Sequence, residues 1–532
     1  MNKIMDQQRL IDLLTKRFSP GLIAEAVVRN GNEVHVAAAP EGVSGVCLFL
    51  NKDLGLPLIS MVGNDEKDTA GVEVIYYVFA CDQGKFTVLI KSPVRKDKSE
   101  FSSITPTIPA AHWYEREIRD MLGLEPVGHP DRRRLALHKD WPGGLHPLRR
   151  DFDRYQEVPR RAGDFKFQQV EGEGVIQIPV GPIHAGIIEP GHFRFSAVGE
   201  TVINLEARLF YTHRGLEKQC IGEPVAKTLF LAERICGACS LSHSTAFCQA
   251  VEKIAGTELP ERAKFIRTVA LELERLYNHI GDVGNISAGT GFAFVTMHGA
   301  RLKEEIMRLN EAVFGSRFLR GINTPGGVRR DFDLGLIDMI TDVLDRVEED
   351  FRQVTEIMFT TDSYMDRVET TGRLPYQTAL DLHAVGPAAR ASGIDRDTRR
   401  DLPYAAYDRV QFPVPVYTEG DVLARIRVRV DEVHASMGII RQALALLPGG
   451  PIRAELPPLP AYRAALGITE SARGENVHFL ITGPDNTVYR YMVRSASYCN
   501  WPVLPVTVPG NIVPDFPLIN KSFELCYACL DR

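Results

Sequence analysis

The sequence has few cysteines and no long apolar run. No segment reaches the roughly 18 consecutive apolar residues that a membrane-spanning helix requires, and residues 1–10 are polar where a signal peptide would be apolar. Nine cysteines among 532 residues are too few for a disulfide scaffold. These absences argue against a membrane-spanning chain and a disulfide-stapled secreted domain, so a soluble globular protein is expected.

The chain has no long tail of one charge, although Arg132, Arg133 and Arg134 with Arg149 and Arg150 form local basic clusters that a solvated or salt-bridged surface explains. The 62 basic and 68 acidic residues are well mixed and leave a net charge of -6. Without a long tail of one sign, nucleic acid is not an expected partner. Hydrophobic residues make up 44% of the chain, which is enough to build a packed core.

Short β-rich runs dominate the first part of the chain. They predict strands at residues 22–28, 34–38, 72–80 and 86–90, the last two forming a hairpin across Asp82-Gln83-Gly84. A helix is expected from about Ala110 to Leu122. The pattern predicts an α/β domain over residues 1–160, and the polar stretch that follows suits a linker.

Apolar residues at helical spacing mark the second part. Two stripes, near residues 265–280 and 336–358, predict helices longer than 15 residues, and Pro260 suits the first turn of the earlier one. We therefore expect a mainly helical domain over residues 165–532 with a central bundle of long helices. The predicted fold class of the whole chain is α+β.

Four of the nine cysteines lie in two Cys-x-x-Cys pairs. The first is Cys236-Gly-Ala-Cys239, with His243 four residues later, and the second is Cys526-Tyr-Ala-Cys529. Four thiolates from two tight turns can hold zinc, iron or nickel, and the number of sulfurs does not choose the metal. The remaining cysteines are expected to be buried small apolar residues: Cys47, Cys81, Cys220, Cys248 and Cys499.

Two other uses of the pairs stay open. A structural zinc site usually draws both pairs from one short segment, whereas 286 residues lie between Cys239 and Cys526. A redox-active disulfide would need a thioredoxin-like unit, and neither pair has one around it.

The residues around the pairs carry a family resemblance. Arg-Ile-Cys-Gly-Ala-Cys-x-x-x-His at 234–243, together with Cys-x-x-Cys at 526–529, resembles the two signatures of nickel-iron hydrogenase large subunits. Family precursors are cleaved three residues after the last cysteine, and Arg532 occupies that position. The resemblance implies a processed chain or one that never had an extension. Glu524-Leu525 replaces the usual Asp-Pro before the last pair.

The resemblance also implies a role for each ligand. Cys236 and Cys526 would be terminal ligands of nickel, and Cys239 and Cys529 would bridge nickel to an iron that carries carbon monoxide and cyanide. His243 would hydrogen-bond near a bridging sulfur. These roles follow from the family motif and not from the spacing alone.

Heterolytic hydrogen chemistry also needs a base and a proton path. Glu189, in the segment 181–194, resembles the proton-transfer glutamate of the family, and its apolar neighbours Ile187 and Ile188 are expected to raise its pKa. A turn residue is the simpler interpretation of a glutamate before Pro-Gly-His.

Three further residues are candidates through the same resemblance. Arg473 lies in Ala-Arg-Gly where the family has Pro-Arg-Gly, and its guanidinium would overhang the open metal position; a surface arginine is the alternative. Glu217 matches a glutamate that implies a magnesium or iron ion near the C-terminus. Glu524 keeps the carboxylate of the family's aspartate.

Both halves also resemble subunits of respiratory complex I. Residues 114–123, 128–131 and 146–152 look like the C-type subunit of its peripheral arm, and residues 386–393 and 403–407 look like the D-type, quinone-site subunit. A fused C-type domain with a cysteine-bearing large subunit resembles the energy-converting, formate hydrogenlyase type of hydrogenase.

That resemblance implies partners and a location. Expected partners are an iron-sulfur small subunit of the complex I B type, ferredoxin-like subunits, antiporter-like membrane subunits and formate dehydrogenase, with iron-sulfur clusters in the partners only. The chain would lie at the cytoplasmic face of the membrane and evolve hydrogen. The rival hypotheses are a complex I-like quinone or coupling subunit that has lost the metal, and a zinc-bearing scaffold.

Overall fold

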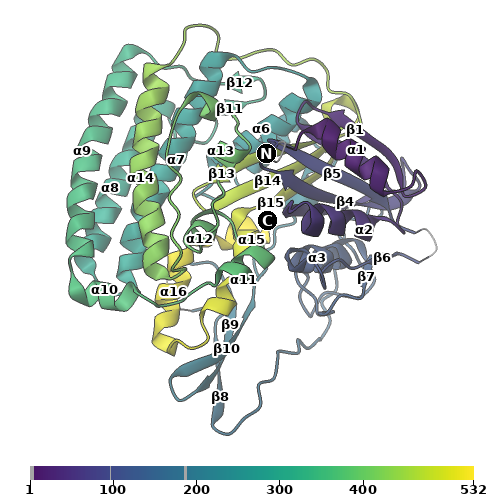
Figure 1. The fold of residues 1–532 in the computed structure, drawn as a ribbon, viewed down its shortest axis with the longest axis horizontal. Coiled ribbons are helices and arrows are strands. Elements are labelled where there is room, and N and C mark those ends of the chain that lie inside the picture. Colours follow the sequence, from purple (N-terminus) through teal and green to yellow (C-terminus); the bar gives the residue numbers. More distant parts are fainter. Residues whose placement is uncertain (1–4, 96–97, 185–187) are drawn as a thin grey trace.

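The computed structural model describes residues 5–95, 98–184 and 188–532. A five-stranded sheet forms the centre of its N-terminal part (Figure 1). The strand order is β1-β2-β5-β4-β3, in which β2 and β5 are parallel and the other neighbours antiparallel. The strands are β1 (Ile23–Arg29), β2 (Glu33–Ala38), β3 (Leu58–Glu66), β4 (Val72–Cys81) and β5 (Phe86–Pro93). The predicted hairpin is confirmed, because Cys81 pairs with Phe86.

Helices and a small sheet complete this part. They are α1 (Gln7–Arg17), α2 (Val43–Leu48), α3 (His112–Leu122), β6 (Glu100–Ser102) and β7 (Glu125–Val127). Helix α3 matches the predicted helix and packs against β3. It ends at Gly123, whose φ of +74° is left-handed and suits glycine.

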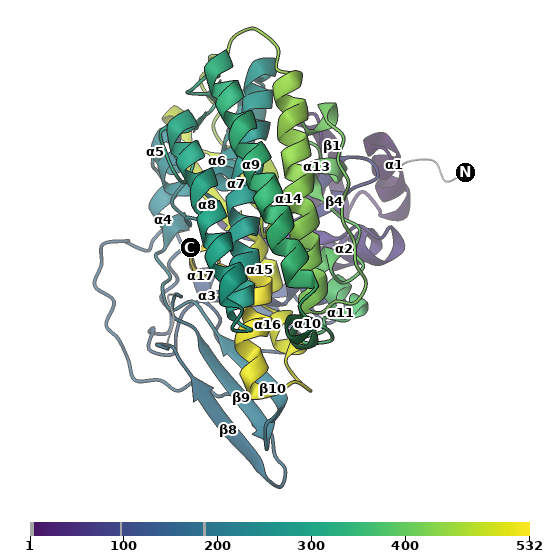
Figure 2. The same ribbon diagram turned by 90° about the vertical axis from the view of Figure 1, so that its left-hand side faces the viewer.

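Four long helices stand side by side in the second part (Figures 1 and 2). They are α7 (Glu261–Ala288), α8 (Ala293–Phe314), α9 (Leu334–Phe359) and α14 (Val422–Ala445). The two predicted helices correspond to α7, which Pro260 precedes, and α9. Helices α7 and α8 approach closely where Gly284 meets Gly299, since a Cβ on Gly299 would lie 2.8 Å from the Cα of Gly284.

Sheets interrupt the helical part, so the described region is mixed. Strands β8 (Val175–Val180), β9 (His192–Val198) and β10 (Thr201–Arg208) form a sheet that projects from the body (Figure 1). A second sheet, of β13 (Ala464–Ser471), β14 (Gly474–Thr482) and β15 (Val488–Arg494), packs against α6 (Ser240–Ala255). A two-stranded ribbon consists of β11 (Asn323–Thr324) and β12 (Gly327–Val328).

Short helices fill the connections. They are α4 (Leu216–Cys220), α5 (Val225–Ala232), α10 (Asp362–Val368), α11 (Tyr376–Asp381), α12 (Gly386–Arg390), α13 (Thr398–Asp401), α15 (Ala496–Asn500), α16 (Phe516–Phe523) and α17 (Tyr527–Asp531). Within the described ranges, no helix is both long and apolar enough to cross a membrane.

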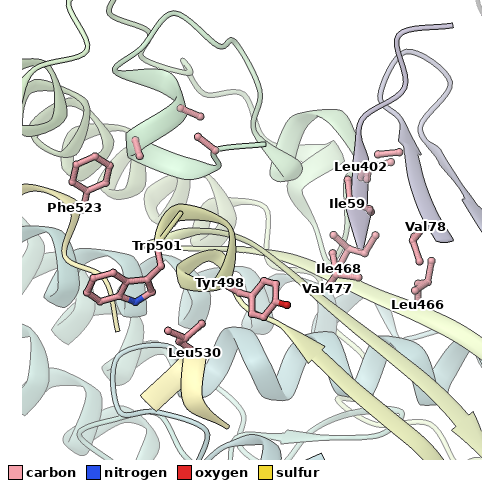
Figure 3. Close-up of a cluster of buried hydrophobic side chains, with 14 of the residues drawn as sticks. Ile59, Val78, Leu402, Leu466, Ile468, Val477, Tyr498, Trp501, Phe523 and Leu530 are labelled. Atoms are coloured by element: carbon pink, nitrogen blue, oxygen red, sulfur yellow. The ribbon is translucent and has the colours of Figure 1, made fainter. Parts of the chain in front are cut away.

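The N-terminal sheet and the β13–β15 sheet share one hydrophobic core. Figure 3 shows Ile59 and Val78 of the first sheet near Ile468 and Val477 of the second. The Arg494 guanidinium also donates to the carbonyl of Ile59 at 2.8 Å. The two parts are therefore joined by buried apolar contacts as well as by the connecting chain.

Arg532 forms contacts with three separate segments of the chain. The buried Arg532 guanidinium donates to Glu217 on α4 and to the Val493 carbonyl on β15, at 2.7 and 2.6 Å. It also forms an ion pair with Glu117 on α3. This guanidinium therefore links the N-terminal part to the second part.

Replacing Arg532 with methionine should destabilise the protein by about 3–5 kcal/mol, because removal of one partner leaves buried carboxylates uncompensated. Denaturant unfolding would measure the loss. Arg352→Met, which breaks exposed contacts with Glu349 and Glu356, should leave the unfolding midpoint unchanged. Equal stability of the Arg532 variant and wild type would contradict a structural role for this cluster.

Candidate metal centre

Each Cys-x-x-Cys pair lies at the start of a helix. Cys239 immediately precedes α6 and Cys526 immediately precedes α17. In both pairs the amide of the second cysteine donates to the sulfur of the first, at 3.2 Å for Cys239 to Cys236 and 3.3 Å for Cys529 to Cys526. The first turn of a helix has free amides, so this spacing turns two sulfurs toward one point.

The structure brings the two pairs together. The sulfurs of Cys236, Cys239 and Cys529 and a ring nitrogen of His243 all lie within 4.8 Å of one another. The Cys526 sulfur interacts with those of Cys236 and Cys529, and contact with Cys236 lowers the pKa values of Cys239 and Cys526. Contact with Cys239 raises the pKa of Cys236, and contact with Cys236 raises the pKa of Cys529, so the four sulfurs share their protons. A buried set of four sulfurs fits soft metals such as nickel and iron. The other five cysteines are buried and free, as predicted.

Arg473 lies between β13 and β14 and is buried, so the surface-arginine alternative is wrong. Its terminal nitrogens donate to both oxygens of Asp282, at 2.7 and 2.9 Å. Burial opposes the charge, but the Asp282 carboxylate raises the pKa of Arg473 above its ordinary value. The charges of Cys239 and Cys526 act in the same direction. Arg473 Nε also donates to the carbonyl of Glu524, two residues before Cys526, at 2.7 Å, so the cation lies close to the second cysteine pair.

Glu524 forms the turn that presents the second pair. Its φ of 51° is left-handed and ends α16, and the Cys526 amide then donates to the Ser497 hydroxyl at 3.0 Å. Asn285 donates to the carboxylate at 2.6 Å. Burial, with Asp282 nearby, raises the pKa of Glu524 to about 7. The turn is therefore held by hydrogen bonds in place of the family's proline.

Glu189 contacts the second pair from the solvent side. Its carboxylate accepts the amide of Ala528, between the two cysteines, at 2.5 Å. Partial burial and the charge of Cys526 raise its pKa. Desolvation is the predicted cause, but Ile188 is 51% exposed, and Ile187 lies outside the described residues.

Glu217 is surrounded by arginines. One oxygen accepts from Arg532 at 2.7 Å and the other from Arg490 at 2.8 Å. A magnesium or iron ion on this carboxylate would have to displace a guanidinium that already balances its charge. The contacts of Glu217 do not fit the predicted ion.

Sequence reasoning missed several residues that support the cluster. Glu274 on α7 accepts the amides of Leu241 and Ser242 at the start of α6, at 2.6 and 3.0 Å. Burial and the charge of Cys239 raise its pKa to about 8. Polar side chains at positions 274, 278 and 282, four residues apart within an apolar stripe, were the signal that could have revealed this face.

His243 contacts the cluster as predicted and has a partner that was not. One ring nitrogen lies 3.4 Å from the Cys529 sulfur, and the other lies 2.9 Å from Nε2 of His478. His478 is a single histidine within strand β14. Nothing in the sequence pattern distinguishes it from an ordinary buried core residue.

Three protein families match parts of this chain. The family described as "Respiratory-chain NADH dehydrogenase, 30 Kd subunit" matches residues 36–158, and the corresponding 49 Kd subunit family matches residues 289–461 and 458–532. The "Nickel-dependent hydrogenase" family matches residues 214–283, which include the first cysteine pair.

Individual relatives match over most of the chain. Formate hydrogenlyase subunit 5 of Escherichia coli is 37% identical over 99% of this chain and 93% of its own length. Hydrogenase-4 component G of the same organism is 38% identical over 91% of this chain and 85% of its own length. The C/D subunit of NADH-quinone oxidoreductase from Bacteroides fragilis is 29% identical over 88% of this chain and 92% of its own length. The chain therefore belongs to the nickel-iron hydrogenase large subunits of the formate hydrogenlyase and hydrogenase-4 type, in which domains of the complex I 30 Kd and 49 Kd kind are fused.

Proposed function

We propose that this chain is the catalytic large subunit of a hydrogen-evolving nickel-iron hydrogenase. The observation that carries the proposal is the convergence of two distant cysteine pairs and His243 in one buried cluster. Relatives named as subunits of formate hydrogenlyase and hydrogenase-4 support it. The physiological reaction would be the reduction of protons by electrons from an iron-sulfur small subunit.

Four cysteines would hold the metals, with Cys236 and Cys526 as terminal ligands and Cys239 and Cys529 as bridges. A bound nickel-iron centre, whose iron carries carbon monoxide and cyanide, supplies the two-electron chemistry of hydrogen formation. The chain supplies the surroundings. Arg473, held rigidly by Asp282, keeps a positive charge beside the sulfurs.

Glu189 would carry protons between the cluster and solvent. It contacts the turn that bears Cys526 and Cys529, it is exposed on its other side, and its raised pKa brings proton uptake closer to neutral pH. Glu524, which is partly buried, lies 3.8 Å from Arg473 and has a pKa of about 7, would hold the second pair in place and shape the charge around it.

We infer the partners and the location from the similarity to subunits of formate hydrogenlyase and hydrogenase-4. We propose an N-terminal domain of residues 1–160 of the complex I C type and a second domain of residues 165–532. Together they would assemble with a B-type iron-sulfur subunit, ferredoxin-like subunits and antiporter-like membrane subunits in a formate hydrogenlyase-like complex at the cytoplasmic face of the membrane.

A complex I-like quinone or coupling subunit is the second candidate. The 29% identity to the C/D subunit of NADH-quinone oxidoreductase favours it. The four-cysteine cluster argues against it, because quinone chemistry has no use for a buried set of metal-binding sulfurs.

The metal content of the purified complex tests the first proposal. We expect about one nickel per chain, measured by elemental analysis, and loss of nickel in Cys526→Ala. Cys81→Ala, which removes an isolated buried cysteine in the N-terminal sheet, should keep the full amount. Zinc in place of nickel, or no metal, would reject the hydrogenase proposal.

Replacement of Glu189 with glutamine tests the proton relay. Hydrogen evolution should fall on the order of 100-fold or more, because glutamine cannot take up and release the proton, while the nickel content stays the same. Glu200→Gln, at the exposed turn between β9 and β10, is the matched control. Unchanged hydrogen evolution in the Glu189 variant would remove this residue from the mechanism.

A further inference from the structure

A chain of three hydrogen bonds leads from the cluster into the core. His243 contacts the Cys529 sulfur, its second ring nitrogen contacts His478 Nε2 at 2.9 Å, and His478 Nδ1 contacts the Tyr491 hydroxyl at 2.7 Å. We propose that His478 and Tyr491 are positioning residues that hold His243 as an N–H donor to Cys529. The proposal rests on the hydrogenase function proposed above.

Local structure aligns the three side chains. His243 lies on α6, one turn after Cys239. Its backbone amide donates to the carbonyl of Cys239 at 3.0 Å. Helix α6 packs on β14, which carries His478. Tyr491 on β15 pairs with Leu480, so it lies diagonally across the sheet from His478 and within reach of it.

The direction of the hydrogen bonds follows from counting protons. A metal-bound Cys529 sulfur has no proton, so His243 must present Nε2–H to it. A neutral imidazole then accepts at Nδ1, which requires a proton on Nε2 of His478. His478 in turn accepts at Nδ1, and the Tyr491 hydroxyl is the donor. Only this direction satisfies all three contacts.

Both imidazoles are neutral in this arrangement. Within the described part of the chain, no carboxylate hydrogen-bonds to either ring. Burial lowers the pKa of His478 far below its ordinary value, and the charge of Arg494 acts in the same direction. The phenol of Tyr491 is buried too, and burial raises its pKa, so it keeps its proton.

A hydrogen bond to a thiolate reduces the electron density that sulfur gives to a metal. Without the Tyr491 hydroxyl, Nδ1 of His478 loses its hydrogen-bond donor, and the polarisation of the chain that ends at the donor to Cys529 is weakened. The variant centre should therefore be harder to reduce. The effect concerns the electronic state of the centre and not the assembly of the site.

Tyr491→Phe in the intact, nickel-loaded complex tests this inference. In a redox titration followed by electron paramagnetic resonance, the ratio of reduced to oxidised nickel at a fixed potential should fall about tenfold, a negative shift of about 59 mV for one electron. The infrared carbonyl band of the iron should move to lower wavenumber. His478→Phe should produce shifts in the same direction.

Tyr489→Phe provides the matched control. It removes a hydroxyl from the same strand, one that contacts Asp68 and Thr69 and has no link to either histidine. Nickel-loaded Tyr491 and His478 variants with the wild-type potential and band would overturn the inference while leaving the hydrogenase proposal intact. Absence of nickel from the wild-type complex would instead reject the hydrogenase proposal.

Discussion

The cluster depends on the position of the last helical turn of the chain. Cys526 immediately precedes, and Cys529 lies in, a five-residue helix, which is too short to be stable alone. Neighbours hold it: Asp531 accepts the amides of Phe210 and Thr212, at 3.0 and 2.8 Å, and Arg214 donates to carbonyls of both cysteine segments. The convergence of the sulfurs therefore follows from interactions that surround the turn and not from the cysteine pairs themselves.

Local patterns were sufficient to predict part of this structure. Period-two and helical spacing predicted the β4–β5 hairpin, α3, α7 and α9, and the Cys-x-x-Cys spacing predicted two tight turns. Spacing could not predict that the turns meet, since that requires the β13–β15 sheet and α17 to fold against α6. It also could not find His478, because a single polar residue on a buried face has no periodic signal.

The core contains several buried arginines. Arg267, Arg275, Arg390, Arg399 and Arg494 are among the largest fully buried side chains, and each pairs with a carboxylate or a carbonyl. Such pairs add little net stability, yet the loss of one partner is strongly destabilising. Their effect is to specify one arrangement of helices and sheets, which a metal site with rigid neighbours requires.

The N-terminal part also helps to fix the end of the chain that carries the second cysteine pair. Its helix α3 supplies Glu117, which pairs with Arg532 three residues after Cys529. Arg532 and Arg490 provide two positive charges against Glu117 and Glu217, so the group is neutral without a divalent ion. A guanidinium, unlike a hydrated ion, is covalently attached to the segment that it fixes. Removal of α3 would leave Arg532 partly unpaired and would loosen the turn that carries the second cysteine pair.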